Sequence, residues 1–110
     1  MSMIGKSTKI FRGSIIWGEK NTILKIGENC SIGYYAVLDG SGGLQIGDYV
    51  HIASPSVGIW THSSVKNALN GIDFSDISYS QNLDYETVKI GNNIWIGGKV
   101  TIYPGVNISD

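Results

Sequence analysis

The chain has 110 residues and a formal net charge of −1, which suits one domain with one core and gives no broad positive surface for nucleic acid. Hydrophobic residues make up 42% and charged residues 15%, proportions typical of an ordered soluble protein and not of a disordered one. No apolar run approaches the ~20 residues that a membrane span needs, and the single cysteine excludes an internal disulfide, so we expect a cytoplasmic protein.

Aliphatic residues return every six positions through most of the chain. An α-helix repeats its faces at about 3.6 and 7.2 residues, so a period of six does not fit a helix. It fits strands, because residues two apart in a strand share a face. A less regular first set, Ile4, Ile10 and Ile16, precedes Ile26, Ile32, Leu38 and Leu44, then Ile46 and Ile52, and after a gap Ile90, Ile96, Ile102 and Ile108.

Three segments share one pattern: residues 24–33 (LKIGENCSIG), 44–53 (LQIGDYVHIA) and 88–97 (VKIGNNIWIG). Faces of six residues, stacked coil on coil, predict an all-β parallel β-helix that buries its aliphatics between neighbouring coils. A β-sandwich with accidental spacing is the alternative, but sandwich strands keep no fixed period of six. Small or β-branched inward side chains are expected at Cys30, Ala36, Val50, Ser56, Val100 and Val106, with Cys30 a buried structural thiol.

The six-residue period of aliphatic residues stops at IWTHSS (59–64) and resumes at VKIG (88–91). The segment of about residues 60–87 is polar and is much longer than an ordinary connection between strands. We therefore expect a functional loop that leaves the stack at one corner. His62 lies at the root of this loop, where a rigid coil would fix its position. The simpler alternative is that His62 only caps a turn.

The repeats, the WTH at the break and IGNNIWIGGKVTIYPGVNISD (90–110) resemble the hexapeptide-repeat O-acetyltransferases, and most of all the sugar and lipopolysaccharide acetyltransferases related to the galactoside and maltose enzymes. LDGSGGLQIGD (38–48) resembles the surface-polysaccharide branch. The resemblance covers nearly the whole chain. It implies one domain, residues 1–110, folded as a single-stranded left-handed β-helix against the usual right-handed crossover rule, and a homotrimer with active sites between subunits.

The resemblance also implies a reaction. In that family the histidine at the position of His62 is the general base, which removes a proton from an acceptor hydroxyl that then attacks the thioester of acetyl-CoA. Histidine suits this task because its ordinary pKa lies near neutrality. The acceptor would be a sugar or a surface-polysaccharide precursor, and no acyl-enzyme is required.

Two residues are candidates for the acetyl-CoA side of the site. Alternation turns Ile94 and Ile96 inward and Trp95 outward, and the family's cofactor-contacting position falls on Gly98. Plain subunit packing is the alternative for both. Lys99 could meet a phosphate, although a lone lysine is more often solvated.

Acceptor-binding residues are less well indicated. The asparagine and tyrosine of the galactoside enzymes fall here on Gly33 and Ser31 and are not carried over. Asp39, Tyr35 and Trp60 are candidates by location, because aromatic faces stack on sugar rings and a carboxylate accepts hydroxyl protons, but each could simply lie on the surface.

A metal site is not expected. The γ-class carbonic anhydrases share this fold and bind zinc through three histidines, whereas this chain has only His62 and His51. His51 alternates outward, so we expect it on the surface.

The last coil, GVNISD, stops in mid-repeat, where family members continue with further coils that grip CoA, so we expect C-terminal coils to be missing. A non-catalytic hexapeptide trimerisation or binding module, or a truncated enzyme fragment, is therefore the alternative to an acetyltransferase.

Overall fold

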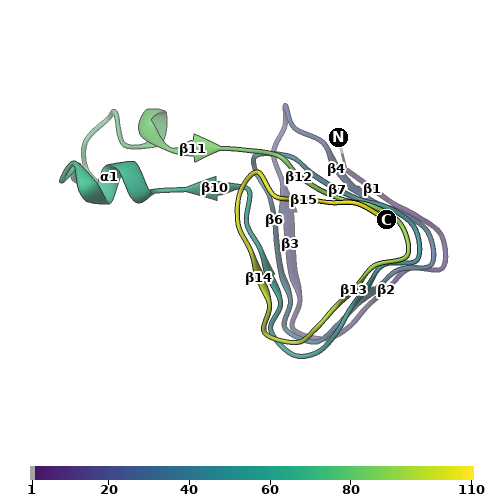
Figure 1. Ribbon diagram of the computed structural model, residues 1–110. Helices are drawn as coiled ribbons and strands as arrows, with labels where there is room; N and C mark the ends of the chain where they lie inside the picture. Colours follow the sequence, from purple (N-terminus) through teal and green to yellow (C-terminus); the bar gives the residue numbers. More distant parts are fainter. Residues whose placement is uncertain (1) are drawn as a thin grey trace.

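A computed structural model describes residues 2–110 as a triangular solenoid with one long excursion (Figure 1). Three parallel sheets form the sides of the prism, and we name them faces A, B and C. Face A has the order β1 (Ser2–Ile4), β4 (Leu24–Ile26), β7 (Leu44–Ile46), β12 (Val88–Ile90) and β15 (Asn107–Ile108). Face B has β2 (Lys9–Ile10), β5 (Ser31–Ile32), β8 (His51–Ile52) and β13 (Trp95–Ile96), and face C has β3 (Ile15–Gly18), β6 (Val37–Gly40), β9 (Gly58–Ile59) and β14 (Thr101–Ile102).

The parallel β-helix prediction is confirmed by the register of the strands. Each inward aliphatic sits beside its equivalent in the next coil: Ile46 pairs with Ile26 on one side and with Ile90 on the other. The chain turns clockwise as it approaches the viewer in Figure 1, so the coil is left-handed. Even the irregular first set is in register, because Ile4 lies beside Ile26. Each repeat of about six residues therefore forms one flat face, and three repeats form one turn around an apolar axis.

The core runs along the axis of the prism. It contains the expected aliphatics and also Cys30, whose exposed fraction is 3%. Inward residues of the two end coils are less covered because each has a neighbouring coil on one side only: Ile10 is 44% exposed and Val100 is 40% exposed.

One expected inward position is wrong. Ser56 is exposed and adopts a left-handed backbone conformation, while Val57 is 1% exposed and fills the inward slot. The reason is an extra residue at the corner between β8 and β9. Ile52 and Ile59 occupy equivalent inward positions seven residues apart instead of six, and Ile59 stays in register with Leu38. The stack thus accommodates an insertion at a corner without losing its core.

The corner between faces A and B is held by a ladder of side chains that bond to the neighbouring coil. The Asp48 carboxylate accepts a hydrogen bond from the Glu28 N–H at 2.8 Å, and the Asn92 side-chain oxygen accepts one from the Asp48 N–H at 2.7 Å. Asp110 repeats the arrangement with the Asn92 N–H at 2.9 Å. Asp48, Asn92 and Asp110 therefore each satisfy a backbone donor that the turn of the preceding coil leaves unpaired.

The expected loop is an excursion that leaves the prism at the corner between faces C and A (Figure 1). Its root is a two-stranded antiparallel ribbon of β10 (His62–Ser63) and β11 (Asp84–Tyr85), in which His62 lies opposite Tyr85. Beyond it lie α1 (Val65–Leu69) and the 3₁₀ helix η1 (Ser80–Asn82). The buried Asn67 side chain donates to the Tyr79 carbonyl at 3.0 Å and ties these two parts together. Within residues 2–110, no helix has the length and apolar character to cross a membrane.

Candidate active site

A buried carboxylate holds the imidazole at the root of the excursion. Asp39 points outward from β6 on face C, yet its exposed fraction is 0%, with Trp17 beside it on β3 and Thr61 and His62 bonded to it. Its Oδ2 lies 2.5 Å from Nδ1 of His62, whose side chain is 32% exposed. A carboxylate only accepts hydrogen bonds, so Nδ1 carries the proton and the lone pair of His62 lies on Nε2.

Asp39 is held by more than the histidine. Its Oδ1 accepts hydrogen bonds from the Ser41 N–H at 2.9 Å and the Ser41 hydroxyl at 2.6 Å, and its Oδ2 accepts one from the Thr61 N–H at 2.9 Å. Burial acts to raise the pKa of Asp39, but the hydrogen bonds from Ser41, Thr61 and His62 together hold this pKa below its usual value. Asp39 is therefore ionised at neutral pH, as a fixed partner for the imidazole.

Strand register explains why these residues meet. β6 pairs with β9 so that Leu38 lies beside Ile59, which places Asp39 next to Trp60 one residue later. The Thr61 hydroxyl then donates to the Asp39 carbonyl at 2.9 Å and accepts from the Gly42 N–H at 2.7 Å. These bonds fix the point at which the chain turns away from the stack, so the imidazole that follows has a defined position.

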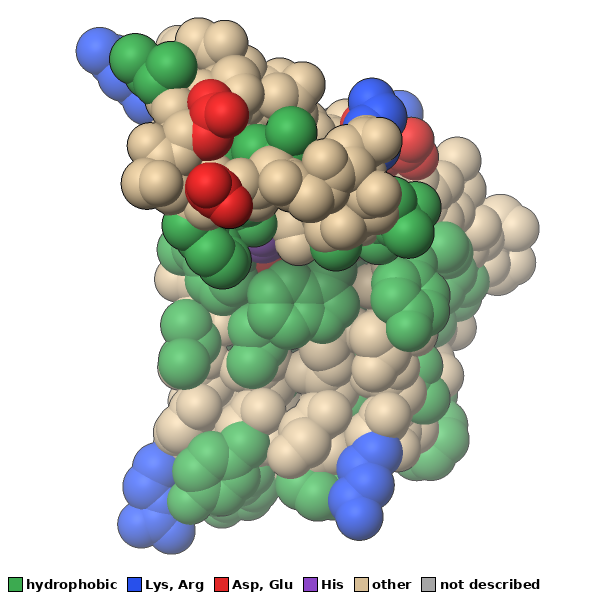
Figure 2. All heavy atoms as spheres, turned by 90° about the vertical axis from the view of Figure 1, so that its left-hand side faces the viewer, with side chains coloured by type: hydrophobic (Ala, Val, Ile, Leu, Met, Phe, Trp, Pro, Cys, Tyr) green, Lys and Arg blue, Asp and Glu red, His purple; other side chains and the backbone are tan. Residues whose placement is uncertain are grey.

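Aromatic rings surround the exposed side of the imidazole. Trp60 lies 6.2 Å from His62 between ring centroids, Tyr85 lies 6.1 Å from His62, and Trp17 lies 6.2 Å from Trp60. Figure 2 shows hydrophobic side chains gathered on the prism directly beneath the excursion. The site is thus an open aromatic surface next to a basic nitrogen, rather than an enclosed cavity.

Three of the predicted site residues come together and three do not. His62, Asp39 and Trp60 form one cluster, and Asp39 is not the surface residue that the alternative interpretation expected. Tyr35 lies at the corner between faces B and C, away from this cluster, and is 56% exposed. The functional roles of all these residues stay predictions.

The two residues expected on the acetyl-CoA side lie elsewhere on the chain. Trp95 is 70% exposed on face B, where β13 pairs it with His51, which is exposed as predicted. Gly98 follows at the corner between faces B and C, and a Cβ there would lie 2.5 Å from the Ser54 carbonyl oxygen. Stacking alone therefore requires glycine at 98. Neither residue approaches His62 of the same chain.

Several members of the cluster were not found from the sequence. Trp17 comes to it from β3, one coil earlier, because β3 pairs Trp17 with Asp39. Tyr85 comes from the far end of the excursion through its pairing with His62. Two further members are Ser41 and Thr61. Ser41 is two residues from Asp39 and Thr61 lies between Trp60 and His62, and this closeness in the sequence was the only indication that they belong to the site.

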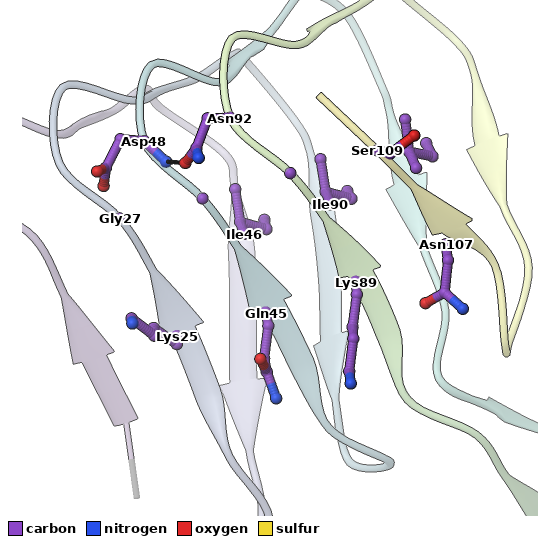
Figure 3. Close-up of a pocket in the computed structure, with 13 residues that line it drawn as sticks. Lys25, Gly27, Gln45, Ile46, Asp48, Lys89, Ile90, Asn92, Asn107 and Ser109 are labelled. Carbon is purple, nitrogen blue, oxygen red and sulfur yellow. Dashed lines mark hydrogen bonds between the residues drawn. The ribbon is translucent and has the colours of Figure 1, made fainter.

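A separate groove of about 450 Å³ lies on face A, and His62 is not among its lining residues (Figure 3). In the part of the chain that the structure describes, no three His, Cys, Asp or Glu side chains gather as ligands of a metal ion would.

Comparison with known proteins shows similarity to a yeast protein. The chain is 39% identical over 92 residues, 74% of its length, to the Saccharomyces cerevisiae (strain S288c) protein named "Putative acetyltransferase YJL218W". The alignment covers 41% of that yeast protein, so the chain spans about two fifths of the relative it matches. No protein-family model matches the chain. The solenoid of hexapeptide repeats and this relative both fit a hexapeptide-repeat acetyltransferase.

Proposed function

We propose that the protein is an acetyltransferase that moves an acetyl group from acetyl-CoA to a hydroxyl of a sugar or surface-polysaccharide precursor. The observation that supports this most is the hydrogen bond that Nδ1–H of His62 donates to buried Asp39, which leaves Nε2 free beside an exposed aromatic surface. The acetyltransferase relative supports the reaction class.

In the proposed reaction, His62 acts as general base. Nε2 accepts the proton of the acceptor hydroxyl as its oxygen attacks the thioester carbonyl, giving a tetrahedral adduct and an imidazolium. Collapse of the adduct breaks the carbon–sulfur bond, and the imidazolium returns the proton to the CoA thiolate. Ionised Asp39 stabilises the imidazolium and keeps the ring in the correct tautomer, as the carboxylate of a serine-protease triad does.

The acceptor would bind against the aromatic surface. Trp60 and Trp17 present ring faces on face C that are partly exposed, and such rings stack against the apolar side of a pyranose. Tyr85 would cover the acceptor from the excursion. The sugar class follows from this surface and from the resemblance, and Tyr35 stays a candidate for a more distant contact.

We also propose a homotrimer in which each site is shared by two chains. Trp95 and Gly98 are on a different side of the prism from His62, so they can approach an imidazole only if it belongs to a second copy. Face C carries apolar outward residues that such packing would cover: Ile15 is 58% exposed and Tyr103 is 69% exposed. The cytoplasmic location expected from the lone cysteine stays a prediction.

The second candidate is a non-catalytic hexapeptide module or a fragment of a longer enzyme, and the chain spans 41% of the yeast relative. One experiment separates the two. Purified protein is incubated with acetyl-CoA and a panel of mono- and oligosaccharides, and the released CoA thiol is measured for wild type and His62→Ala. Acceptor-dependent release by wild type alone supports the enzyme. Equal background from both proteins over the whole panel supports the module.

A further inference from the structure

Face A carries a regular ladder of long polar side chains (Figure 3). Lys25, Gln45, Lys89 and Asn107 occupy the same outward position on β4, β7, β12 and β15, which are consecutive strands in register. Ammonium and amide groups therefore alternate along the solenoid axis. Neighbouring strands lie about 4.8 Å apart, so the two lysines are separated by roughly 9.6 Å at their Cα atoms.

The four side chains of this ladder have no internal partners. Throughout residues 2–110, they take part in no hydrogen bond or ion pair, and Lys25, Lys89 and Asn107 are exposed. They border the groove of about 450 Å³, whose lining residues include no aromatic side chain. Their donors and acceptors are thus available to a ligand.

The other border of the groove is formed by glycines and by two side chains that accept hydrogen bonds from the backbone. Gly27, Gly47 and Gly91 leave a strip without side chains, because a Cβ at each would clash with the next coil. Asp48 and Asn92 stand beyond this strip, and each accepts a backbone hydrogen bond from the neighbouring coil. A flexible, flat ligand can therefore lie along the strip with the lysine ladder on one side and, on the other, the Asp48 carboxylate, one oxygen of which already accepts the Glu28 N–H.

We propose that face A binds an extended acidic polysaccharide in which every second sugar carries a carboxylate. Lys25 and Lys89 would pair with carboxylates on alternate sugars, and the Gln45 and Asn107 amides would bond to hydroxyls of the sugars between them. A nucleic acid strand repeats its charges far more closely than this ladder does.

This surface is independent of the proposed acetyl transfer. None of the residues of the cluster around His62 lines the groove, and the measurements below detect binding without turnover. Either proposal can therefore fail while the other stands.

The test is calorimetric titration at low salt with three oligosaccharides of equal length: a hyaluronate oligomer with a carboxylate on alternate sugars, an oligogalacturonate with one on every sugar, and a neutral malto-oligomer. The hyaluronate oligomer is expected to bind most tightly. Lys25→Gln with Lys89→Gln should weaken it about tenfold, the sum of two exposed ion pairs. The matched control, Lys9→Gln with Lys20→Gln, removes the same charge away from the groove and should change affinity less than about twofold.

Gln45→Lys tests the alternation itself. It places an ammonium on three consecutive strands, so the preference should move from the hyaluronate oligomer toward the oligogalacturonate. The proposal is overturned if wild type binds neither acidic oligomer, if the two double variants weaken binding equally, or if Gln45→Lys leaves the preference unchanged. Among residues 2–110, none of these side chains has a hydrogen-bond or ion-pair partner, so circular dichroism should show unaltered folding for each variant.

Discussion

At the scale of single residues, the site depends on one buried carboxylate whose two oxygens both accept hydrogen bonds from the chain. Asp39 has no exposed surface, and backbone and hydroxyl donors from Ser41 and Thr61 occupy the sites that His62 leaves. A carboxylate held in this way cannot swing toward an acceptor. Its effect on the proposed chemistry must pass through the imidazole, so we propose that Asp39 positions His62 and does not contact the acceptor.

Asp39→Asn tests that assignment. The amide keeps the size of the carboxylate but neither stabilises an imidazolium nor fixes the Nδ1–H tautomer, so kcat should fall by about 10²-fold or more while KM changes little. Ser41→Ala removes a donor to Asp39 but preserves the Asp39–His62 hydrogen bond, and it should lose less than about tenfold. Steady-state kinetics measures both. Equal kcat in wild type and Asp39→Asn would contradict the role.

The lowered pKa of Asp39 also predicts an acid-sensitive stability. A carboxyl whose pKa is depressed by folding stabilises the folded state above its ordinary value of 3.8 and loses that contribution as the pH falls through the folded value. The difference in unfolding free energy between wild type and Asp39→Asn should therefore be constant above about pH 5 and shrink below pH 3.8. Urea denaturation at several pH values measures it. Asp76 and Asp110, whose pKa values are also lowered, cancel in the comparison because both proteins contain them.

At the scale of elements, the corner between faces A and B offers a matched pair of acids. Asp48→Ala removes the acceptor of the Glu28 N–H and should lower the free energy of unfolding by about 1 kcal/mol. Glu28 occupies the equivalent position one coil earlier, but its side chain makes no hydrogen bond among residues 2–110, so Glu28→Ala should cost less than about 0.5 kcal/mol. Denaturant unfolding compares them, and equal losses would show that the ladder adds no stability.

The elements differ in how well the sequence predicts them. The inward aliphatics were predictable because an aliphatic residue is buried at every sixth position, face after face. The corner between β8 and β9 was not, because an extra residue there shifts the slot from Ser56 to Val57 and leaves the next strand in register. Counting every sixth residue cannot detect an extra residue that the backbone accommodates within a turn.

The candidate site was predictable only in part, for a related reason. His62 stood out because the rhythm breaks beside it, and Trp60 was its neighbour in the sequence. Trp17 and Tyr85 are brought in by the pairing of β3 with β6 and of β10 with β11, contacts that no local pattern encodes. The burial of Asp39 likewise depends on contacts with Thr61 and His62 at the root of the excursion, so its outward position in the alternation suggested the surface.

At the scale of the whole molecule, the solenoid behaves as a one-dimensional stack in which each coil contacts only its neighbours. Ile46 is 1% exposed between two coils, whereas Ile4 in the first described coil is 50% exposed with a neighbour on one side. Ile46→Ala should lower the unfolding free energy by about 2–5 kcal/mol, and Ile4→Ala by about 1 kcal/mol or less. Urea melts compare them; similar losses would contradict a stack stabilised by nearest neighbours.

A shared active site predicts complementation between inactive chains. His62→Ala lacks the proposed base and Trp95→Glu alters the proposed acetyl-CoA side, so each variant alone should be nearly inactive. Co-expressed in equal amounts, they should form mixed trimers with about a quarter of wild-type activity, the share of interfaces that pair two intact halves. Activity no greater than the sum of the separate variants would place the whole site in one chain.

The most direct measurement is a single turnover with acetyl-CoA that carries a ¹³C-labelled acetyl group, followed by mass spectrometry of both the acceptor saccharide and the protein. The label should appear as an ester on the saccharide with wild type, disappear from it with His62→Asn, and never become attached to the protein. Label on the protein, or equal labelling of the saccharide by wild type and His62→Asn, would contradict direct transfer assisted by His62.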